Sequence, residues 1–327
     1  MKKVFVYNII IFLCLIFFLE LTVRIFSSVN LLGIKSDLII ENSEPFSYKP
    51  NAKSIIFGKT VFTDEHGFRV PSSKFKYGGA RSVLVLGDST SYGVGVNEEK
   101  TFIGILRKKF PELNIYNTSL AGHNINDHIQ IIEKYKLKLN IQKIYFFLNL
   151  NDIVYLDTRT RMQNFKNEKN NLSLIDKFKK VNIISQTNFF LRSKSALYVY
   201  IKSMVTNPSK THFQDIYNMY QDEKNLVDYQ KKLNKLIQNV GKNIELNVVL
   251  LPWEHQLKNQ CANKDLLFPQ DFITKYFLDK KVVYFNVTNN FCKNKKSEEM
   301  YLKFDPAHLS SKGHKYIENI ISENNLF

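Results

Sequence analysis

A serine directly follows a short apolar run in the first third of the chain. Val83 to Leu86 are consecutive aliphatic residues, and Gly87-Asp88-Ser89 ends the run. An apolar run that stops at a turn signal predicts a buried strand of a parallel sheet. Because open α/β sheets bind ligands beyond the carboxyl ends of their strands, Ser89 is placed where a nucleophile would be useful. A strand-to-helix turn with a capping serine explains the same tripeptide.

Asp305-Pro306-Ala307-His308 carries a second set of reactive groups. A serine hydroxyl becomes a good nucleophile when a base takes its proton, and a carboxylate holds that base in the right tautomer. His308 is the candidate base and Asp305 the candidate carboxylate. Their spacing lets Asp305 fold back in a tight turn to reach Nδ1, which leaves Nε2 for Ser89. A helix N-terminal turn with a solvated histidine is the alternative interpretation.

Two further segments place polar residues after apolar strands. Residues 117–124, which include Gly122, follow the strand-like 113–116, and Asn151-Asp152 ends the apolar run 144–150. A turn glycine and an Asx turn explain these residues without any chemistry. A glycine can also present its N–H with no side chain in the way, and an asparagine is a neutral hydrogen-bond donor.

The order Gly-Asp-Ser, glycine, Asn-Asp and Asp-x-x-His resembles the four blocks of the SGNH (GDSL-type) hydrolase superfamily. The resemblance covers Ser82 to Asn325, and three of the four blocks come just after a predicted strand. It implies a serine hydrolase with Ser89 as nucleophile, His308 as base and Asp305 as the carboxylate that orients the base.

The same resemblance implies an oxyanion hole, because a developing oxyanion needs preorganised donors. It assigns the backbone N–H groups of Ser89 and Gly122 and the side-chain amide of Asn151 to that role. Two positions depart from the family pattern: Asn149 stands where a glycine is usual, and Ser119 stands where relatives often have another glycine. Asn149 would narrow the pocket or add a donor, which makes the role of Asn151 the one to test.

Strands and helices alternate around these blocks. Three strands with two intervening helices form a βαβαβ pattern, which predicts parallel pairing and right-handed crossovers. The predicted helices are 102–110, 125–137, 217–240 and 313–321, and two further strands are 246–251 and 282–285. We therefore predict an α/β fold with five parallel strands and helices on both faces, which the resemblance identifies as a flavodoxin-like three-layer sandwich.

The first 29 residues have the pattern of a signal anchor. Lys2-Lys3 precede an apolar run from Val4 to Leu19, and its continuation to Phe26 brings it near the roughly 20 residues that cross a bilayer. Positive charge before the run places the N-terminus in the cytoplasm and exports the remainder. Because Ser27-Ser28-Val29 is a poor cleavage site, we favour an uncleaved single-pass anchor in the cell membrane over a cleaved signal peptide and a secreted protein.

The remainder divides into two expected parts. Residues 30–80 form a spacer and a small β-rich extension, and a Gly-Phe-Arg segment like the one at 67–69 often precedes the Gly-Asp-Ser block in membrane-anchored relatives. Residues 81–327 form the hydrolase-like catalytic domain. Within it, residues 157–211 are polar and helix-prone, and we expect a cap or lid beside the active site.

Composition excludes several classes. A hydrophobic content of 44% with 13% aromatic residues supports a packed core rather than disorder. The formal charge of +16 would suit nucleic acid, but the lysines are scattered and no nucleic-acid motif is present. We therefore expect no nucleic-acid partner and interpret the charge as suited to an anionic cell envelope.

The cysteines and remaining histidines do not match a metal site. Cys14 lies in the apolar N-terminal run, and Cys261 and Cys292 either pair in an oxidising compartment or stay as free thiols. His123 and His128 lack the spacing of metal ligands, and the helical pattern predicts that His314 lies on a helix surface. No metal and no cofactor are expected.

These observations predict a membrane-anchored, extracytoplasmic serine esterase that removes an acyl group, most simply acetyl, from a carbohydrate or lipid. Protein partners are left open. An O-acyltransferase would use the same Ser89 acyl-enzyme and pass the group to a sugar hydroxyl of an envelope glycan, and the triad does not distinguish the two acceptors. A non-catalytic glycan-binding envelope protein is the third candidate, against which the intact Ser89, Asp305 and His308 argue.

Overall fold

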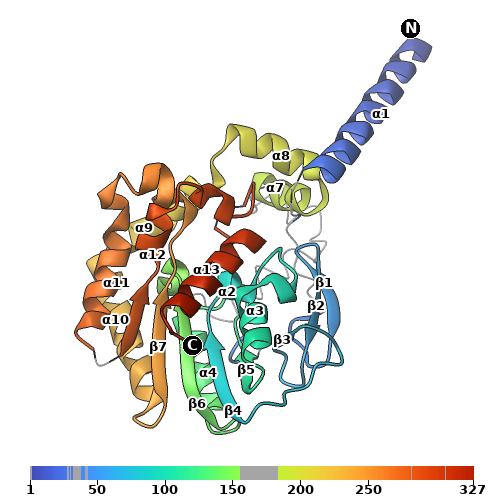
Figure 1. The fold of residues 1–327 in the computed structure, drawn as a ribbon. Coiled ribbons are helices and arrows are strands. Elements are labelled where there is room, and N and C mark those ends of the chain that lie inside the picture. The colour runs from blue at the N-terminus through green and yellow to red at the C-terminus, as the bar shows by residue number, and fades with distance from the viewer. Residues whose placement is uncertain are drawn as a thin grey trace.

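A five-stranded parallel sheet forms the centre of the molecule (Figure 1). The structure, a computed structural model, describes residues 2–27, 29, 31, 38–40, 43–154, 183–280, 282–305 and 307–327. The strands are β4 (Arg81–Leu86), β5 (Leu113–Asn117), β6 (Ile141–Leu148), β7 (Glu245–Leu250) and β8 (Val283–Asn286). Their order across the sheet is β5-β4-β6-β7-β8, and every neighbouring pair is parallel. In chain order this is 2-1-3-4-5, the flavodoxin-like arrangement, so the predicted fold class is confirmed.

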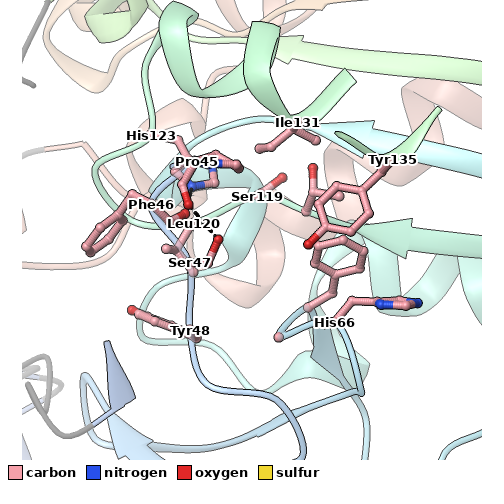
Figure 2. Close-up of a pocket in the computed structure, with 13 residues that line it drawn as sticks. Pro45, Phe46, Ser47, Tyr48, His66, Ser119, Leu120, His123, Ile131 and Tyr135 are labelled. Atoms are coloured by element: carbon pink, nitrogen blue, oxygen red, sulfur yellow. Dashed lines mark hydrogen bonds between the residues drawn. The ribbon is translucent and has the colours of Figure 1, made fainter. Parts of the chain in front are cut away.

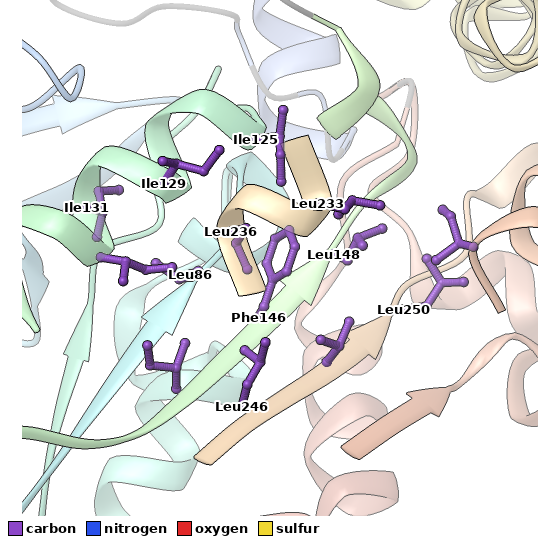
Figure 3. Packing of buried hydrophobic residues seen from close by; sticks show 14 of the residues in the cluster. Leu86, Ile125, Ile129, Ile131, Phe146, Leu148, Leu233, Leu236, Leu246 and Leu250 are labelled. Carbon is purple, nitrogen blue, oxygen red and sulfur yellow. The ribbon is translucent and has the colours of Figure 1, made fainter. Parts of the chain in front are cut away.

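Helices cover both faces of the sheet and form a hydrophobic core on each face. One core is shared with α4 (Ile125–Tyr135), α10 (Glu223–Val240) and α11 (Phe268–Leu278), and the other with α3 (Phe102–Lys109), α12 (Thr288–Lys293) and α13 (Ser311–Glu323). Strand β6 feeds both cores, because successive side chains of a strand point to opposite faces. Phe146 and Leu148 enter the first core, and Tyr145 and Phe147 the second. Figure 3 shows Phe146 packed among the helix residues of the first core.

The predicted helix 217–240 is two helices in the structure. α9 (Pro208–Tyr220) stops before α10 begins at Glu223. The side chain of Asp222 accepts a hydrogen bond from the N–H of Asn225 at 3.1 Å and caps the second helix. A capping aspartate starts a new helix more favourably than it continues an old one, which explains the break.

The segment before the central sheet contains the expected short strands. β1 (Lys53–Ile56), β2 (Lys59–Thr63) and β3 (Arg69–Val70) form a three-stranded antiparallel sheet. The buried Arg69 guanidinium donates to the carbonyl oxygens of Tyr92 and Gly93, just after Ser89, at 2.6 and 2.9 Å. The extension is thus attached to the helix that carries Ser89.

The N-terminal run forms one long helix, α1 (Lys2–Phe26), which is long and apolar enough to cross a membrane. Of the expected insertion 157–211, residues 157–182 lie outside the described residues. The remainder forms α7 (Ile183–Lys194), α8 (Ala196–Val205) and the start of α9. Short elements complete the description: α2 (Ser89–Tyr92), η2 (Glu98–Lys100), η3 (Leu150–Ile153), η4 (Glu254–Gln260), η5 (Lys264–Leu267) and η6 (Ser297–Met300).

Two of the three cysteines are bonded to each other. Cys261 and Cys292 form a disulfide with their Cα atoms 5.5 Å apart, which decides between the two states that the sequence left open. Cys14 is free and exposed on α1.

Candidate active site

Ser89 is the first residue of α2 and follows β4 through a tight turn. The Asp88 side chain caps α2 by accepting a hydrogen bond from the N–H of Thr90 at 2.9 Å. A Cβ on Gly87 would lie 2.6 Å from the Cβ of Ser91, so the turn needs a glycine there. Ser89 is half-buried, and its hydroxyl donates to Asp88 Oδ2 at 3.4 Å. The serine therefore stands at the carboxyl edge of the sheet, as predicted.

The Asp305–His308 turn has the geometry that its spacing predicts. Nδ1 of His308 lies 2.8 Å from Oδ1 and 2.9 Å from Oδ2 of Asp305. The backbone N–H groups of Ala307 and His308 also donate to Oδ1, at 3.0 and 2.8 Å. These bonds fix the carboxylate and occupy Nδ1, so Nε2 is the nitrogen left to accept a proton.

Electrostatics favour the charged pair. Burial opposes ionisation of Asp305, but the His308 charge and the hydrogen bonds from His308 and Ala307 outweigh it and lower the pKa of Asp305. Burial alone would likewise lower the pKa of His308. The charge and hydrogen bond of Asp305, together with the charge of Asp88, raise the pKa of His308 above its ordinary value. An imidazolium formed during catalysis is thus stabilised where it would arise.

Ser89 and His308, both within the described chain, are not joined by a hydrogen bond in this structure. Asp88, the neighbour of Ser89, is near enough for its charge to act on His308. Phe57 of the extension lies beside the imidazole, with ring centroids 6.3 Å apart. Catalytic hydrogen bonds are often long or misaligned without substrate, and the Ser89–His308 contact stays a prediction.

Gly122 has a backbone suited to presenting its N–H. Its φ of +91° lies in the left-handed region that favours glycine, and a Cβ built there would meet nothing within 4 Å. The space beside this backbone is therefore open. Its role as an oxyanion donor stays a prediction.

Asn149 and Asn151 have different surroundings, because β6 ends at Leu148 and the 3₁₀-helix η3 begins at Leu150. Asn149 is 1% exposed, and its amide donates to Thr90 Oγ1 at 2.7 Å and to Asp88 Oδ2 at 3.1 Å. Both amide hydrogens are used, so Asn149 adds no free donor to the site. Asn151 is half-buried, and its buried Oδ1 has no hydrogen-bond partner among the described residues.

Three residues near the site were not recognised from the sequence. Asp88 is a cap and a charge acting on His308, Trp253 donates through Nε1 to Asn149 Oδ1, and the His212 ring stacks on Trp253 with centroids 4.7 Å apart. Burial, followed by the charge of His308, lowers the pKa of His212. Trp253 comes just after the carboxyl end of β7, and this position in the sequence was the signal that could have placed it near the site. Nothing local in the sequence of α9 marks His212.

The surface position predicted for His314 is wrong. Its side chain is fully buried, and Nδ1 accepts a hydrogen bond from the N–H of Phe102 at 3.3 Å. Burial, with the charges of Arg69 and His308, lowers the pKa of His314 to about 3. The helix α13 turns this residue inward against the start of α3, where its ring centroid lies 5.4 Å from that of Phe102.

A small cavity lies beside the loop that carries Gly122 (Figure 2). Its volume of about 10 Å³ is enough for roughly one water molecule. It lies between residues 45–48, the 66–68 turn, the 118–123 loop and α4, and His123 Nε2 is 2.7 Å from the carbonyl oxygen of Phe46 at its edge. Ser89, Asp305 and His308 do not line it, so this cavity is not a substrate pocket for the candidate triad.

Within the described part of the chain, no group of three or more His, Cys, Asp or Glu side chains is arranged to hold a metal ion. No family model matches the chain, and no curated protein matches it.

Several solved structures are similar to this one. A lipase/acylhydrolase from Enterococcus faecalis is 9% identical with a TM-score of 0.45, over 75% of this chain and 94% of that one. A member of the lipolytic protein G-D-S-L family from Veillonella parvula is 13% identical with a TM-score of 0.43, over 75% and 97%. A catalytic mutant of an acetylxylan esterase from Geobacillus stearothermophilus is 11% identical with a TM-score of 0.43, over 76% and 96%.

At these identities and TM-scores, the likenesses say nothing about what this chain acts on. The internal features are more informative: a 2-1-3-4-5 parallel sheet, a serine after its first strand and an Asp–His pair in one turn. The parallel α/β fold is the one that the sequence predicts, and the joint catalytic role of Ser89, Asp305 and His308 stays a prediction.

Proposed function

We propose that the protein is a serine esterase in which Ser89, His308 and Asp305 form the catalytic triad. The observation that carries the proposal is the Asp305–His308 pair, in which both carboxylate oxygens lie within 2.9 Å of Nδ1. This arrangement fixes the tautomer with Nε2 unprotonated, the form that a general base needs.

In the proposed reaction, Ser89 Oγ attacks the ester carbonyl while its proton passes to Nε2 of His308. The negative charge that forms on the carbonyl oxygen is met by the N–H groups of Ser89 and Gly122 and the amide of Asn151. His308 then gives its proton to the leaving alcohol, which leaves an acyl-enzyme on Ser89. Water attacks the acyl-enzyme with His308 again as base, which releases the carboxylic acid and regenerates the Ser89 hydroxyl.

The proposed substrate is an acyl ester, most simply an acetyl ester, on an extracytoplasmic carbohydrate or lipid. The apolar helix α1 supports attachment to a membrane, with Lys3 at its start on the cytoplasmic side. The chain would then be single-pass, with residues from about 30 onward outside the cytoplasm.

Turnover of an aryl acetate by the detergent-solubilised full chain tests the proposal. Ser89→Ala should lower the rate by up to about 10⁶, because the nucleophile is lost. Ser91→Ala is the matched control. The Ser91 hydroxyl is buried with no hydrogen-bond partner in the described structure, so its removal should leave turnover intact.

Retention of more than about a hundredth of the rate by Ser89→Ala would contradict the covalent mechanism. Mass spectrometry of the enzyme quenched during aryl acetate turnover should find the acetyl group on Ser89. Adding a glycan acceptor tests the transferase: acetylated glycan in place of free acetate would identify a transfer reaction through the same serine.

A further inference from the structure

The C-terminal end of α1 is attached to the folded domain by specific contacts. The Glu20 carboxylate sits at the N-terminus of α8 and accepts hydrogen bonds from the N–H groups of Ala196 and Leu197, both at 2.9 Å. It also accepts one from the hydroxyl of Ser195 at 2.7 Å. A carboxylate satisfies the free N–H groups of a first helical turn and complements the positive end of the helix dipole. Glu20 therefore adds to the capping of α8 by Ser195, whose hydroxyl accepts a hydrogen bond from the N–H of Tyr198 at 3.0 Å.

Arg24 extends this attachment by one helical turn. Its guanidinium donates to Glu20 Oε1 at 2.7 Å and to the carbonyl oxygen of Lys194, at the end of α7, at 2.6 Å. Glu20, Val23 and Ser27 are the half-buried positions near the end of α1, and their spacing places them on one helix face. Figure 1 shows α1 standing out from the body, with α7 and α8 at its base.

The helices that α1 contacts have an exposed apolar surface, which we call the α7–α8 surface. Its residues are Phe190, Ile201, Met204 and Val205, which are 60%, 51%, 66% and 82% exposed. Ile201, Met204 and Val205 lie at i, i+3 and i+4, so they form one stripe along α8. Solvent-exposed apolar residues normally occur singly, and a contiguous group marks an interaction site.

The position of Glu20 along α1 places this surface at a membrane boundary. A rise of about 1.5 Å per residue puts Glu20 about 27 Å from the start of the helix, close to the roughly 30 Å thickness of a bilayer's hydrocarbon core. The first turn of α8 would then lie at the outer edge of that core. Lys194, at the end of α7, and Lys202, on α8, accompany the apolar residues, as expected for helices at a surface of anionic lipid.

We propose that the α7–α8 surface rests on the outer face of the bilayer that α1 spans, with its apolar side chains at the boundary between anionic headgroups and acyl chains. The inference rests on the proposed membrane attachment of α1. The inner side of the same helix reaches the candidate site: the Tyr200 ring packs on Phe304, next to Asp305, with centroids 5.3 Å apart. The surface thus connects the bilayer to the loop that holds the proposed catalytic carboxylate.

Single-cysteine labelling of the full chain tests the proposal. Cys14→Ser removes the free thiol and leaves the Cys261–Cys292 disulfide intact. Met204→Cys then reports on the α7–α8 surface. The control is Leu137→Cys. Leu137 is also strongly exposed, at 84%, but it lies just before the amino end of β6, away from the carboxyl ends of the strands. Each variant receives an environment-sensitive fluorophore and is reconstituted in vesicles of phosphatidylglycerol and phosphatidylcholine that contain a spin-labelled quencher lipid.

The label at 204 should be quenched about twofold or more relative to the label at 137. Equal quenching in a protein that stays with the vesicles would overturn the α7–α8 surface while leaving the anchor in place. Release of the protein from the vesicles by salt would instead overturn the anchor, and this inference with it.

Adding Glu20→Ala to the labelled Met204→Cys chain tests the attachment itself. The helix becomes more apolar and still spans the bilayer, so vesicle association should not change. Quenching at 204 should fall by about twofold or more, because α8 loses its hydrogen bonds to α1 while the Ser195 cap remains. Unchanged quenching would show that Glu20 does not position the surface and would overturn that part of the proposal.

Discussion

The side-chain amide of Asn149 lies against the carboxylate of Asp88, with Nδ2 3.1 Å from Oδ2. This bond joins the residue after β6 to the residue before the candidate nucleophile. The same amide donates to Thr90, and Trp253 donates to its oxygen, so the group is fully bonded within the protein. Asn149 therefore holds the ends of neighbouring strands together, and we predict that Asn151 is the amide that meets the substrate.

Substitution of each asparagine separates these two roles. Asn151→Ala should lower kcat by about 10²–10³ with little change in KM, because an oxyanion bond strengthens only in the transition state. Asn149→Ala should mainly lower the free energy of unfolding, by about 1–3 kcal/mol, since Asp88 and Trp253 lose a buried partner. Steady-state kinetics and urea unfolding of both variants measure the two effects. A larger loss of kcat in Asn149→Ala than in Asn151→Ala would place the oxyanion donor at Asn149.

The pH dependence of kcat/KM should report the ionisation of His308. Only the neutral imidazole accepts the Ser89 proton, and the pKa of His308 in the folded protein is raised above its ordinary 6.5. Activity should therefore fall with acid through a limb above pH 6.5.

Asp305→Asn removes the charge that contributes most to raising the pKa of His308. The acid limb should therefore move to lower pH while kcat falls by about 10⁴. Glu299→Gln is the control, because Glu299 is an exposed carboxylate bonded to Lys312. That change should leave the limb in place. A limb that moves to higher pH in Asp305→Asn would contradict the proposed pairing.

Buried His314 should make the fold sensitive to acid. Its pKa is about 3 in the folded protein against an ordinary 6.5, so between these values only the unfolded chain binds the proton. Its contribution to stability is complete above pH 6.5 and should decline by about 1.4 kcal/mol per pH unit below it. Urea unfolding from pH 7 to pH 4 should show a shallower decline for His314→Gln than for the unchanged protein. Parallel declines would mean that His314 titrates normally.

The Cys261–Cys292 disulfide should stabilise the fold. It joins residues 31 positions apart, for which loop-closure entropy predicts about 3–4 kcal/mol. Cys292→Ser should lower the free energy of unfolding by about that amount, whereas Cys14→Ser, at an exposed free cysteine, should not. An equal effect of the two substitutions, measured by denaturant unfolding, would count against the bond.

Local patterns in the sequence were sufficient for the architecture and for the catalytic candidates. Apolar runs and helical spacing predicted the five parallel strands and the helices α3, α4, α10 and α13, because period and turn residues act over a few positions. The Asp305–His308 turn was predictable for the same reason, since its two members are three residues apart. The long apolar helix followed from composition alone.

The tertiary structure decided what depends on residues far apart in the chain. Spacing could not show that His314 turns inward onto Phe102 or that Cys261 and Cys292 form a disulfide. It also could not show that the Asn149 amide is fully hydrogen-bonded to Asp88, Thr90 and Trp253. The contact between Glu20 and Ala196 joins positions 176 residues apart. Such contacts arise when whole elements pack, and a periodic pattern carries no information about which face of one helix meets the end of another. The candidate catalytic residues therefore lie in short segments that can be identified locally, whereas the contacts that hold those segments in place depend on how whole elements pack.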